Sequence, residues 1–136
     1  MIYVDASAIV ALILDEPEAD KIAAIFDAGP PAFTSPIAIY EAVLAIARVR
    51  AAPVAVSKIE VRFLLDRLAI TIEPVEEAHG DMALTAFDRF GKGRHPASLN
   101  MGDCFGYACA TLRNAQILFK GNDFNQTDLP SALPSQ

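Results

Sequence analysis

Four short runs of β-prone residues divide this chain, and helical patterns separate them. The runs cover residues 2–4, 32–34, 69–72 and 116–119. Strands that alternate with helices form parallel sheets, because a parallel neighbour can be reached only through a crossover connection. The sequence therefore predicts an α/β fold with a central parallel sheet of four to five strands, flanked by helices on both faces.

The helical patterns begin and end at residues that favour helix termini. Ser35 before Pro36 predicts a helix over 36–50, and Asn100 predicts the start of a helix over 101–114. Further helices are expected over 7–14, 16–28, 56–68 and 74–90, with a polar loop over 91–99. We expect one domain over residues 1–129 and an irregular tail over 130–136.

Length and composition restrict the class of protein. With 136 residues, 53% of them hydrophobic, the chain can bury one sizeable core. The apolar run over 6–14 is too short to cross a bilayer, and Asp5 precedes it where a signal peptide carries basic residues. Cys104 and Cys109 lie five apart on one predicted helix, which favours neither a disulfide nor a zinc site. We therefore expect a cytoplasmic protein with no membrane association.

The net charge of −6 argues against a protein that holds nucleic acid through a broad positive surface. A substrate that contains phosphate must then be met by bound cations or by a few local basic residues. Lys92 and Arg94 lie in the polar loop, and Lys120 follows the last strand. These residues could contact phosphates, although a solvated loop would show the same polar pattern.

Four acidic residues can meet at the carboxyl edge of the predicted sheet, where open parallel sheets carry their binding crevice. Asp5 ends the first strand, Asp103 lies in the first turn of the last helix, and Asp123 follows the last strand. Glu41 lies on the helix after the second strand, among apolar neighbours where an unpaired carboxylate is costly. A bound cation would stabilise such a cluster, and the hard carboxylate oxygens of the cluster are ligands that suit Mg²⁺ or Mn²⁺.

Each of these acids also has an ordinary structural explanation. The ordinary roles are helix caps for Asp5 and Asp103, an Asx turn for Asp123, and an ion pair of Glu41 with Arg48 or Lys58. Separate roles of this kind give no reason for four acids to converge on one edge of a sheet. Considered one at a time, however, the residues leave both explanations open.

Four segments contain these acids: IYVDASA at 2–8, EAVLAIAR at 41–48, NMGDCFGYA at 100–108 and LFKGNDF at 118–124. In order and spacing they resemble the motifs of the PIN-domain ribonuclease toxins of the VapC type. The resemblance runs from the first residue to about residue 129. It departs from the family in the last motif, where relatives often carry two consecutive acids and this chain has Asn122 before Asp123.

The resemblance implies a PIN-like fold and a metal-dependent endoribonuclease that is the toxin of a type II toxin–antitoxin pair. It implies that the four acids surround one or two Mg²⁺ or Mn²⁺ ions, with Ser7 supporting the site. For metal-assisted hydrolysis we expect Asp5 and Asp103 to be direct ligands. Glu41 and Asp123 would be ligands or would orient a metal-bound water. The candidates for contacts with RNA are Arg94, Lys120 and Lys92.

The same resemblance implies two partners, a second copy of the chain in a homodimer and a cognate antitoxin peptide. Apolar side chains on the first two predicted helices could exceed what one core absorbs; they are Leu12, Ile13, Ile22 and Phe26. Ordinary core packing accounts for them equally well.

Other functional classes remain as alternatives. A catalytically degenerate PIN fold would act only as a binding module and would not bind metal. A phospho-acceptor receiver domain needs an adjacent acidic pair after the first strand, where this chain has only Asp5. A phosphatase with an aspartyl nucleophile needs a second acid two residues later, where Ser7 stands.

Overall fold

The structure, a computed structural model, describes residues 1–133 and contains four strands and six helices within that range. In chain order they are β1 (Ile2–Val4), α1 (Ala6–Ile13), α2 (Ala19–Asp27), β2 (Ala32–Thr34), α3 (Pro36–Arg50), α4 (Val54–Arg67), β3 (Ile70–Ile72), α5 (Glu77–Phe90), α6 (Met101–Leu112) and β4 (Gln116–Leu118). The predicted α/β class and the predicted parallel sheet of four to five strands are confirmed, and within residues 1–133 the sheet has four strands.

The strands lie in the order β3-β2-β1-β4, which places β1 in the interior of the sheet. Tyr3 of β1 pairs with Phe33 of β2 on one side and with Ile117 of β4 on the other. The chain leaves β1 toward β2 and later returns to the opposite side at β4. A reversal of strand order of this kind opens a crevice beyond the carboxyl end of the central strand.

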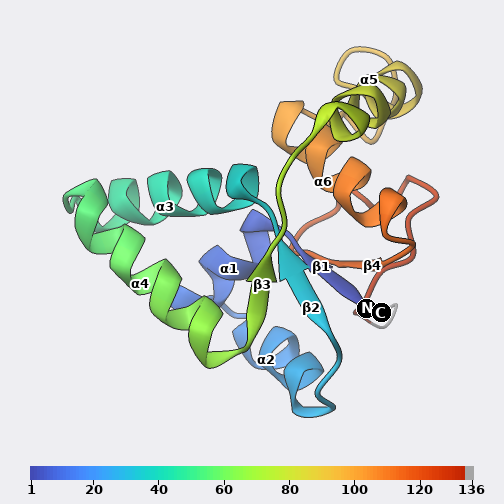
Figure 1. Cartoon of the computed structure of the whole chain (residues 1–136). Coiled ribbons are helices and arrows are strands. Elements are labelled where there is room, and N and C mark those ends of the chain that lie inside the picture. The colour runs from blue at the N-terminus through green and yellow to red at the C-terminus, as the bar shows by residue number, and fades with distance from the viewer. Residues whose placement is uncertain (134–136) are drawn as a thin grey trace.

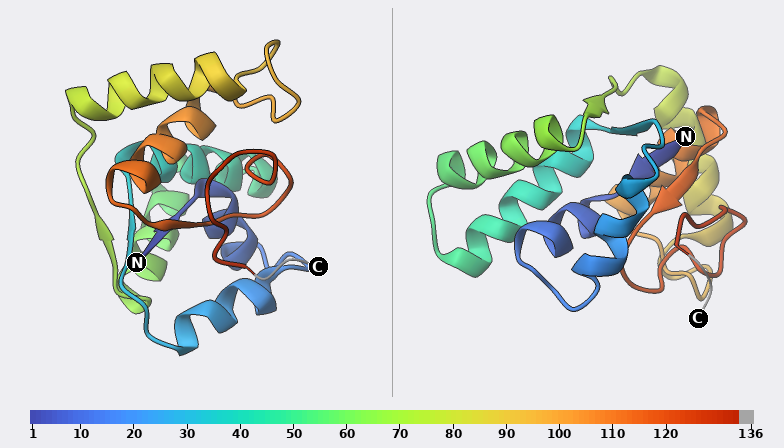
Figure 2. Two further views of the ribbon diagram at one scale, coloured as in Figure 1. Left: turned by 90° about the vertical axis from the view of Figure 1, so that its right-hand side faces the viewer. Right: turned by 90° about the horizontal axis from the view of Figure 1, so that it is seen from below.

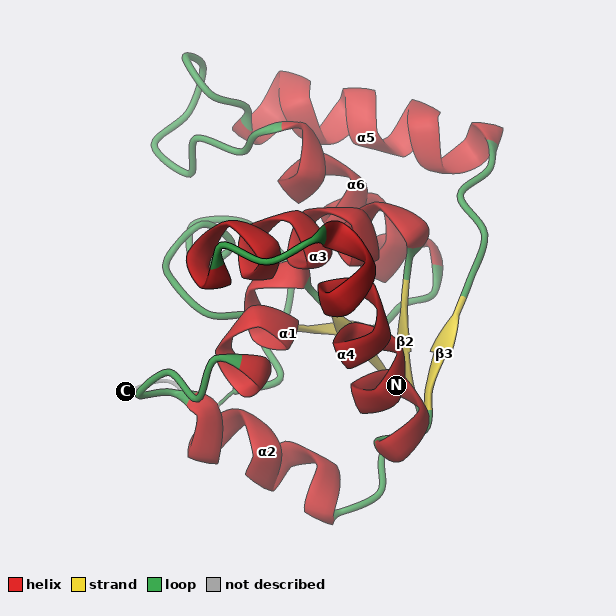
Figure 3. Cartoon of the chain, turned by 90° about the vertical axis from the view of Figure 1, so that its left-hand side faces the viewer, coloured by secondary structure: helices red, strands yellow, loops and turns green. Residues whose placement is uncertain are grey.

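Helices cover both faces of the sheet (Figure 1). α1 and α4 lie on one side, and α6 lies on the other with α5 along its outer surface. The hairpin of α3 and α4 projects away from the sheet, as Figure 2 shows. α2 lies apart from this hairpin, at the lower edge of the view in Figure 3.

The core is centred on β1, whose three residues are at most 4% exposed. Buried polar groups at the ends of β1 and β2 bond to each other. The Thr34 hydroxyl donates to the carbonyl oxygen of Val4 at 2.8 Å, and the hydroxyls of Tyr3 and Ser35 lie 3.0 Å apart. These bonds fix the carboxyl ends of the two strands, from which the crevice residues extend.

Three helices begin two or more residues away from where the sequence predicts. α2 begins at Ala19 and not at residue 16, because Asp15 adopts a left-handed φ of 52° and turns follow it. α5 begins at Glu77 and not at residue 74, because residues 73–76 continue past β3 without helical structure and Glu76 forms the cap. α4 begins two residues early, directly after Pro53.

The apolar side chains of the first two helices belong to the core. Ile22 is fully buried, and Leu12, Ile13 and Phe26 pack against the core as partly buried residues. The large apolar residues that are exposed lie mainly on other helices: Tyr40, Leu44, Val49, Val54, Val56, Ile59, Phe63, Leu84, Phe87, Met101 and Leu112. The four residues selected from the sequence therefore give no sign of an interface.

The segment after Leu129 is ordered where it is described. The Ile117 amide donates to the carbonyl oxygen of Pro130, and the Ala132 amide donates to that of Ile117, which forms a bridge beside β4 at Ser131. The predicted irregular tail thus includes one strand-like contact. Its last residues, 134–136, lie outside the described residues.

Candidate active site

Asp5 joins β1 to α1 at the centre of the carboxyl edge. Its backbone amide donates to the carbonyl oxygen of Leu118 at 3.0 Å, which continues the pairing of β1 with β4. Its side chain is the N-cap of α1, where Oδ2 accepts the Ser7 amide at 3.1 Å and the Ser7 hydroxyl at 2.6 Å. Asp5 is only 7% exposed. The capping role and the site role considered from the sequence therefore coincide in one carboxylate.

Ser7 connects Asp5 to the segment that follows β4. Its hydroxyl donates to Asp5 and accepts the backbone amide of Lys120 at 2.9 Å. One hydroxyl thus holds two parts of the chain that are 113 residues apart in sequence. The position of the loop that carries Asp123 depends on this contact.

Replacing Ser7 by alanine should lower the free energy of unfolding by about 1–3 kcal/mol, because a buried carboxylate and the Lys120 amide both lose a hydrogen bond. Urea denaturation of the metal-free protein measures this change. Ser7→Thr keeps the hydroxyl and is the matched control, which should remain close to the wild type. Equal destabilisation by both variants would show that the hydroxyl is not the stabilising group.

Asp103 lies in the first turn of α6, within a capping box. The Asp103 amide donates to Asn100 Oδ1 at 2.9 Å, and the Asn100 amide donates to Asp103 Oδ2 at 3.1 Å. The reciprocal bonds restrict the Asp103 side chain to one orientation. As with Asp5, the structural role expected for this residue and its place at the crevice occur together.

Glu41 reaches the crevice from α3 and lies directly over Gly102 of α6. A Cβ atom added at Gly102 would overlap the carboxylate of Glu41. Among the described residues, Glu41 forms no salt bridge with Arg48 or Lys58, the pairing considered from the sequence. The absence of a side chain at Gly102 is therefore what gives this carboxylate its space.

Asp123 lies in the exposed turn after β4, beyond Gly121, which has a φ of 108°. Hydrogen bonds in this turn run between its neighbours, since the Asn125 side-chain amide donates to Asn122 Oδ1 at 3.1 Å. Asn122 is therefore turned toward Asn125, and it does not line the pocket that contains the acids. Of the two residues in the last motif, only Asp123 lines that pocket.

One pocket of about 470 Å³ brings the four acids together, and we call it the acid pocket. Its lining consists of Asp5, Ala6, Ser7, Val10, Glu16, Glu41, Ala45, Asp103, Lys120 and Asp123. All four acids and the supporting Ser7 are thus at one place, although they come from four separate parts of the chain.

Burial and neighbouring negative charges raise the pKa values of three carboxylates in this pocket. Burial raises the pKa of Asp5, and the charge of Asp123 adds to this effect. Burial also raises the pKa of Glu41, as does the charge of Asp5. For Asp103, burial and then the charges of the other three acids raise the pKa to about 7, against the opposing hydrogen bond from Asn100. Mutual repulsion of this kind is relieved by a bound cation.

Among residues 1–133, no three Asp, Glu, His or Cys side chains are close enough, as they stand, to hold one ion together. The donor set nevertheless fits Mg²⁺ or Mn²⁺, because it consists of carboxylate oxygens that face one pocket and repel one another. Asp5 and Asp103 are held by hydrogen bonds, whereas Glu41 and Asp123 have none through their carboxylates within this range. Adjustment of Glu41 and Asp123 could therefore complete an ion site.

The basic residues selected from the sequence divide into two groups. Lys120 lines the acid pocket, where its Nζ lies 3.1 Å from Glu16 Oε2. Lys92 and Arg94 do not line it, and Arg94 pairs with Asp88 at 3.3 Å. Of the three, only Lys120 is placed where it could meet a phosphate at the acids.

Sequence reasoning missed two glycines and one acid of this site. Gly102 leaves space for Glu41, and a Cβ on Gly106 would lie 3.4 Å from Asp5 Oδ1. Both glycines therefore allow α6 to lie close to the carboxylates. Their spacing of four on α6 puts them on one face of the helix, a signal that was available beside Asp103. Glu16 lines the pocket through its pairing with Lys120, for which the sequence offers no local signal.

Comparison with known sequences agrees with this geometry. Residues 2–129 match the PIN domain family. Ribonuclease VapC30 of Mycobacterium tuberculosis (strain H37Rv) is 37% identical over 132 residues, which are 96% of this chain and 98% of that protein. A VapC ribonuclease of Rhizobium meliloti (strain 1021) is 35% identical over 141 residues, covering 95% of this chain and 99% of the relative.

Solved structures share the fold at lower identity. Mycobacterium tuberculosis VapC20, described as a sarcin-ricin loop cleaving toxin, superposes with a TM-score of 0.78 at 17% identity, covering 98% of this chain and all of the other. A toxin–antitoxin complex from Klebsiella pneumoniae contains a chain with a TM-score of 0.69 at 15% identity, covering 94% and 93%. With the matches in sequence extending over nearly the whole length, this chain belongs to the PIN-domain family and, within it, to the VapC ribonucleases.

Proposed function

We propose that this protein is a divalent-metal-dependent endoribonuclease, the toxin of a toxin–antitoxin pair, with Asp5, Glu41, Asp103 and Asp123 as its catalytic and metal-binding residues. The observation that carries the proposal is the acid pocket, in which four carboxylates from distant segments line one cavity, and burial and neighbouring negative charges raise the pKa values of Asp5, Glu41 and Asp103. Helix capping alone does not require these acids to share one pocket.

The four carboxylates of the pocket differ in how firmly hydrogen bonds hold them, and we assign their roles on this basis. Asp5 is fixed by Ser7 and Asp103 by Asn100, so these two carboxylates would form the rigid part of an ion site. Glu41 and Asp123 would ligate the ion or orient a water molecule. A bound Mg²⁺ or Mn²⁺ supplies an activated water near neutral pH and offsets charge on the phosphate.

Lys120 is the residue we assign to the phosphate of the substrate, since its ammonium group lies in the wall of the acid pocket. A positive charge here fixes the position of the RNA backbone without reading its sequence. Lys92 and Arg94 lie outside the lining, so they could contact only RNA that extends beyond the acids.

We further propose that the protein assembles with a second copy of itself and with an antitoxin peptide, as the family resemblance implies. Exposed apolar side chains support an interface, with Ile59 at 70%, Phe63 at 66% and Tyr40 at 65% exposure on the α3–α4 hairpin. The fold neighbour from Klebsiella pneumoniae was itself solved as a toxin–antitoxin complex. Within residues 1–133, no helix has both the length and the apolar character of a membrane span. We expect the protein to act in the cytoplasm because cellular RNA is its proposed substrate.

The purified protein should cut single-stranded RNA in Mg²⁺ or Mn²⁺, stop in excess EDTA, and regain its rate when the metal is restored. The reason is that the carboxylates alone lack the positive charge needed to activate water and stabilise the phosphate. Gel analysis of labelled RNA measures the rate, and DNA of the same sequence is the control substrate. Unchanged cleavage in EDTA would contradict metal dependence. No cleavage and no metal binding by calorimetry would favour the degenerate binding module.

A further inference from the structure

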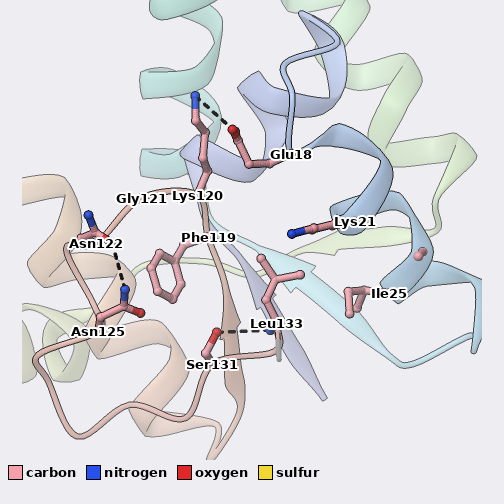
Figure 4. A pocket seen from close by; sticks show the side chains of 11 residues that line it. Glu18, Lys21, Ile25, Phe119, Lys120, Gly121, Asn122, Asn125, Ser131 and Leu133 are labelled. Atoms are coloured by element: carbon pink, nitrogen blue, oxygen red, sulfur yellow. Dashed lines mark hydrogen bonds and ion pairs between the residues drawn. The ribbon is translucent and has the colours of Figure 1, made fainter. Parts of the chain in front are cut away.

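A second and larger pocket lies beside the acid pocket, between α2 and the segment that follows β4 (Figure 4). Its volume is about 1020 Å³, and Lys120 lines both pockets. The Lys120 ammonium lies 3.1 Å from Oε2 of Glu16, which lines the acid pocket, and 3.6 Å from Oε2 of Glu18, which lines the larger one. This ion-paired group is therefore the boundary between them. We call the larger pocket the α2 pocket.

Apolar groups form two sides of the α2 pocket. Ala24 and Ile25 line it from α2, and Phe119 and Leu133 line it from the segments after β4. Ile25, Phe119 and Leu133 are labelled in Figure 4. Ile25 and Leu133 are partly buried, and Ala24 is exposed, so the apolar surface is accessible from solvent. Phe119 is only 5% exposed, so the accessible wall is mainly aliphatic. A nucleobase can be held between apolar side chains of this kind.

Polar groups at the rim match the edge of a base. The Asn125 side-chain amide donates to Asn122 Oδ1, which leaves the amide nitrogen of Asn122 as a donor and Oδ1 of Asn125 as an acceptor. Both residues line the α2 pocket (Figure 4). The Watson–Crick edge of an unpaired base carries donors and acceptors, and either of these two free groups could bond to it.

The charge of the α2 pocket also suits a polyanion. Among the described residues, its lining contains Lys21 and Lys120 against a single acid, Glu18. The acid pocket, in contrast, contains five acids and one lysine. The charge of Lys120 is already paired with Glu16 and Glu18, whereas Lys21 forms no salt bridge within residues 1–133. In a chain with a net charge of −6, Lys21 is thus the group of the α2 pocket that can attract a phosphate directly, without a metal ion.

We propose that the α2 pocket binds a nucleotide of the RNA substrate next to the phosphodiester held at the acids. The base lies on the apolar walls and meets Asn122 and Asn125, and the phosphate lies near Lys21. An unpaired, single-stranded substrate is required, because a base within a duplex cannot enter the pocket. This inference rests on the proposed ribonuclease function and adds a subsite that reads the substrate.

The test measures RNA binding separately from cleavage. Labelled single-stranded RNA oligonucleotides of several sequences are titrated by fluorescence anisotropy into Asp103→Asn protein, which we expect to cut them too slowly to disturb the titration. Ala24→Glu places a bulky acid in the α2 pocket and should weaken binding about tenfold or more, since one stacked base contributes about 1–3 kcal/mol. Ala23→Glu is the matched control: Ala23 is an exposed neighbour on α2 that does not line the pocket, and this variant should change binding less than twofold.

A second pair of variants tests the phosphate contact. Lys21→Gln should reduce the slope of log affinity against log salt concentration by roughly 0.7, as expected for one lost contact to a single strand. Lys58→Gln removes an equal charge from α4 and should leave the slope unchanged. Both variants are on exposed helix surfaces, so neither is expected to disturb folding.

The outcomes separate this inference from the ribonuclease proposal. Suppose that the wild-type protein cuts RNA and that the Ala24→Glu and Ala23→Glu proteins bind RNA equally well. The α2 pocket is then not a nucleotide site, and the ribonuclease proposal stays intact. A protein partner in the pocket would give this same result, because RNA binding would then be unaffected. Wild-type protein that neither binds nor cuts RNA overturns both proposals. Selective loss of binding in Ala24→Glu, with a parallel loss of kcat/KM in the cleavage-competent background, supports the subsite.

Discussion

Asp5→Asn protein should fold normally and cut RNA at least on the order of 10³-fold more slowly than the wild type, because a single preorganised charge at a reaction centre contributes an effect of this size. Asparagine has nearly the same shape as aspartate and is an equally good N-cap, so α1 and the bond to Ser7 can persist. What is lost is a negative charge that is only 7% exposed and faces the other acids.

Two measurements make this prediction specific. Initial rates on a labelled oligonucleotide give the loss of activity, and calorimetric titration with Mn²⁺ gives the accompanying loss of metal affinity. Thermal unfolding of the metal-free protein should show no loss of stability, since removing one of several mutually repelling carboxylates relieves repulsion. Asp103→Asn should behave in the same way, because asparagine can still accept the Asn100 amide.

Asp66→Asn is the control for these variants. It removes the same charge from an exposed position on α4, and RNA cleavage should stay within twofold of the wild type. Wild-type rates in both Asp5→Asn and Asp103→Asn would place the chemistry elsewhere in the molecule, whatever their effects on stability.

The elements that the sequence predicted well are those with local signals. Ser35 before Pro36 set the start of α3, and Asn100 set the start of α6, because a cap bonds to a backbone amide three residues away. Helix starts without such a signal were misplaced. The left-handed backbone at Asp15 delays α2; aspartate tolerates this conformation better than most residues, but it occurs far more often in ordinary backbone, so its presence did not mark the delay.

The proximity of the four acids was predictable, because the residues that follow the strands of a parallel sheet lie at one edge of it. The role of Gly102 was not predictable, because it depends on which side chain of α3 lies over α6 at that position. The same limit applies to the basic residues. Lys92 and Arg94 are near Asp103 in sequence, but the loop over 91–99 does not place them in the lining of the acid pocket.

Gly102 therefore gives the second large effect. Gly102→Ala should lower RNA cleavage about a hundredfold while leaving the protein as stable as the wild type or more stable. The added Cβ overlaps the carboxylate of Glu41, which is the mobile end of a long side chain and can rotate away. Loss of an outer-shell partner of a metal ligand costs about 10–100-fold in metal affinity or activity, and we expect displacement of Glu41 to cost at least the upper part of this range. Alanine is meanwhile favoured over glycine in a helix by up to about 1 kcal/mol.

Gly80→Ala is the matched control for this substitution. Gly80 lies in α5, and a Cβ there meets nothing within 4 Å, so the variant should gain helix stability and keep full activity. Urea denaturation and initial cleavage rates, measured on both variants, separate the steric effect at the site from the general effect of alanine in a helix.

A double-mutant cycle then shows whether Gly102 acts through Glu41. If the alanine methyl harms cleavage only by displacing that carboxylate, Gly102→Ala should cause little further loss in a Glu41→Gln background. Full additivity of the two losses would mean that the methyl disturbs something else, such as the capping box of Asn100 and Asp103 at the same end of α6. Activity in Gly102→Ala equal to that in Gly80→Ala would mean that Glu41 does not need to lie over α6 for catalysis. The proposed ion site would then have to be built from the other three acids.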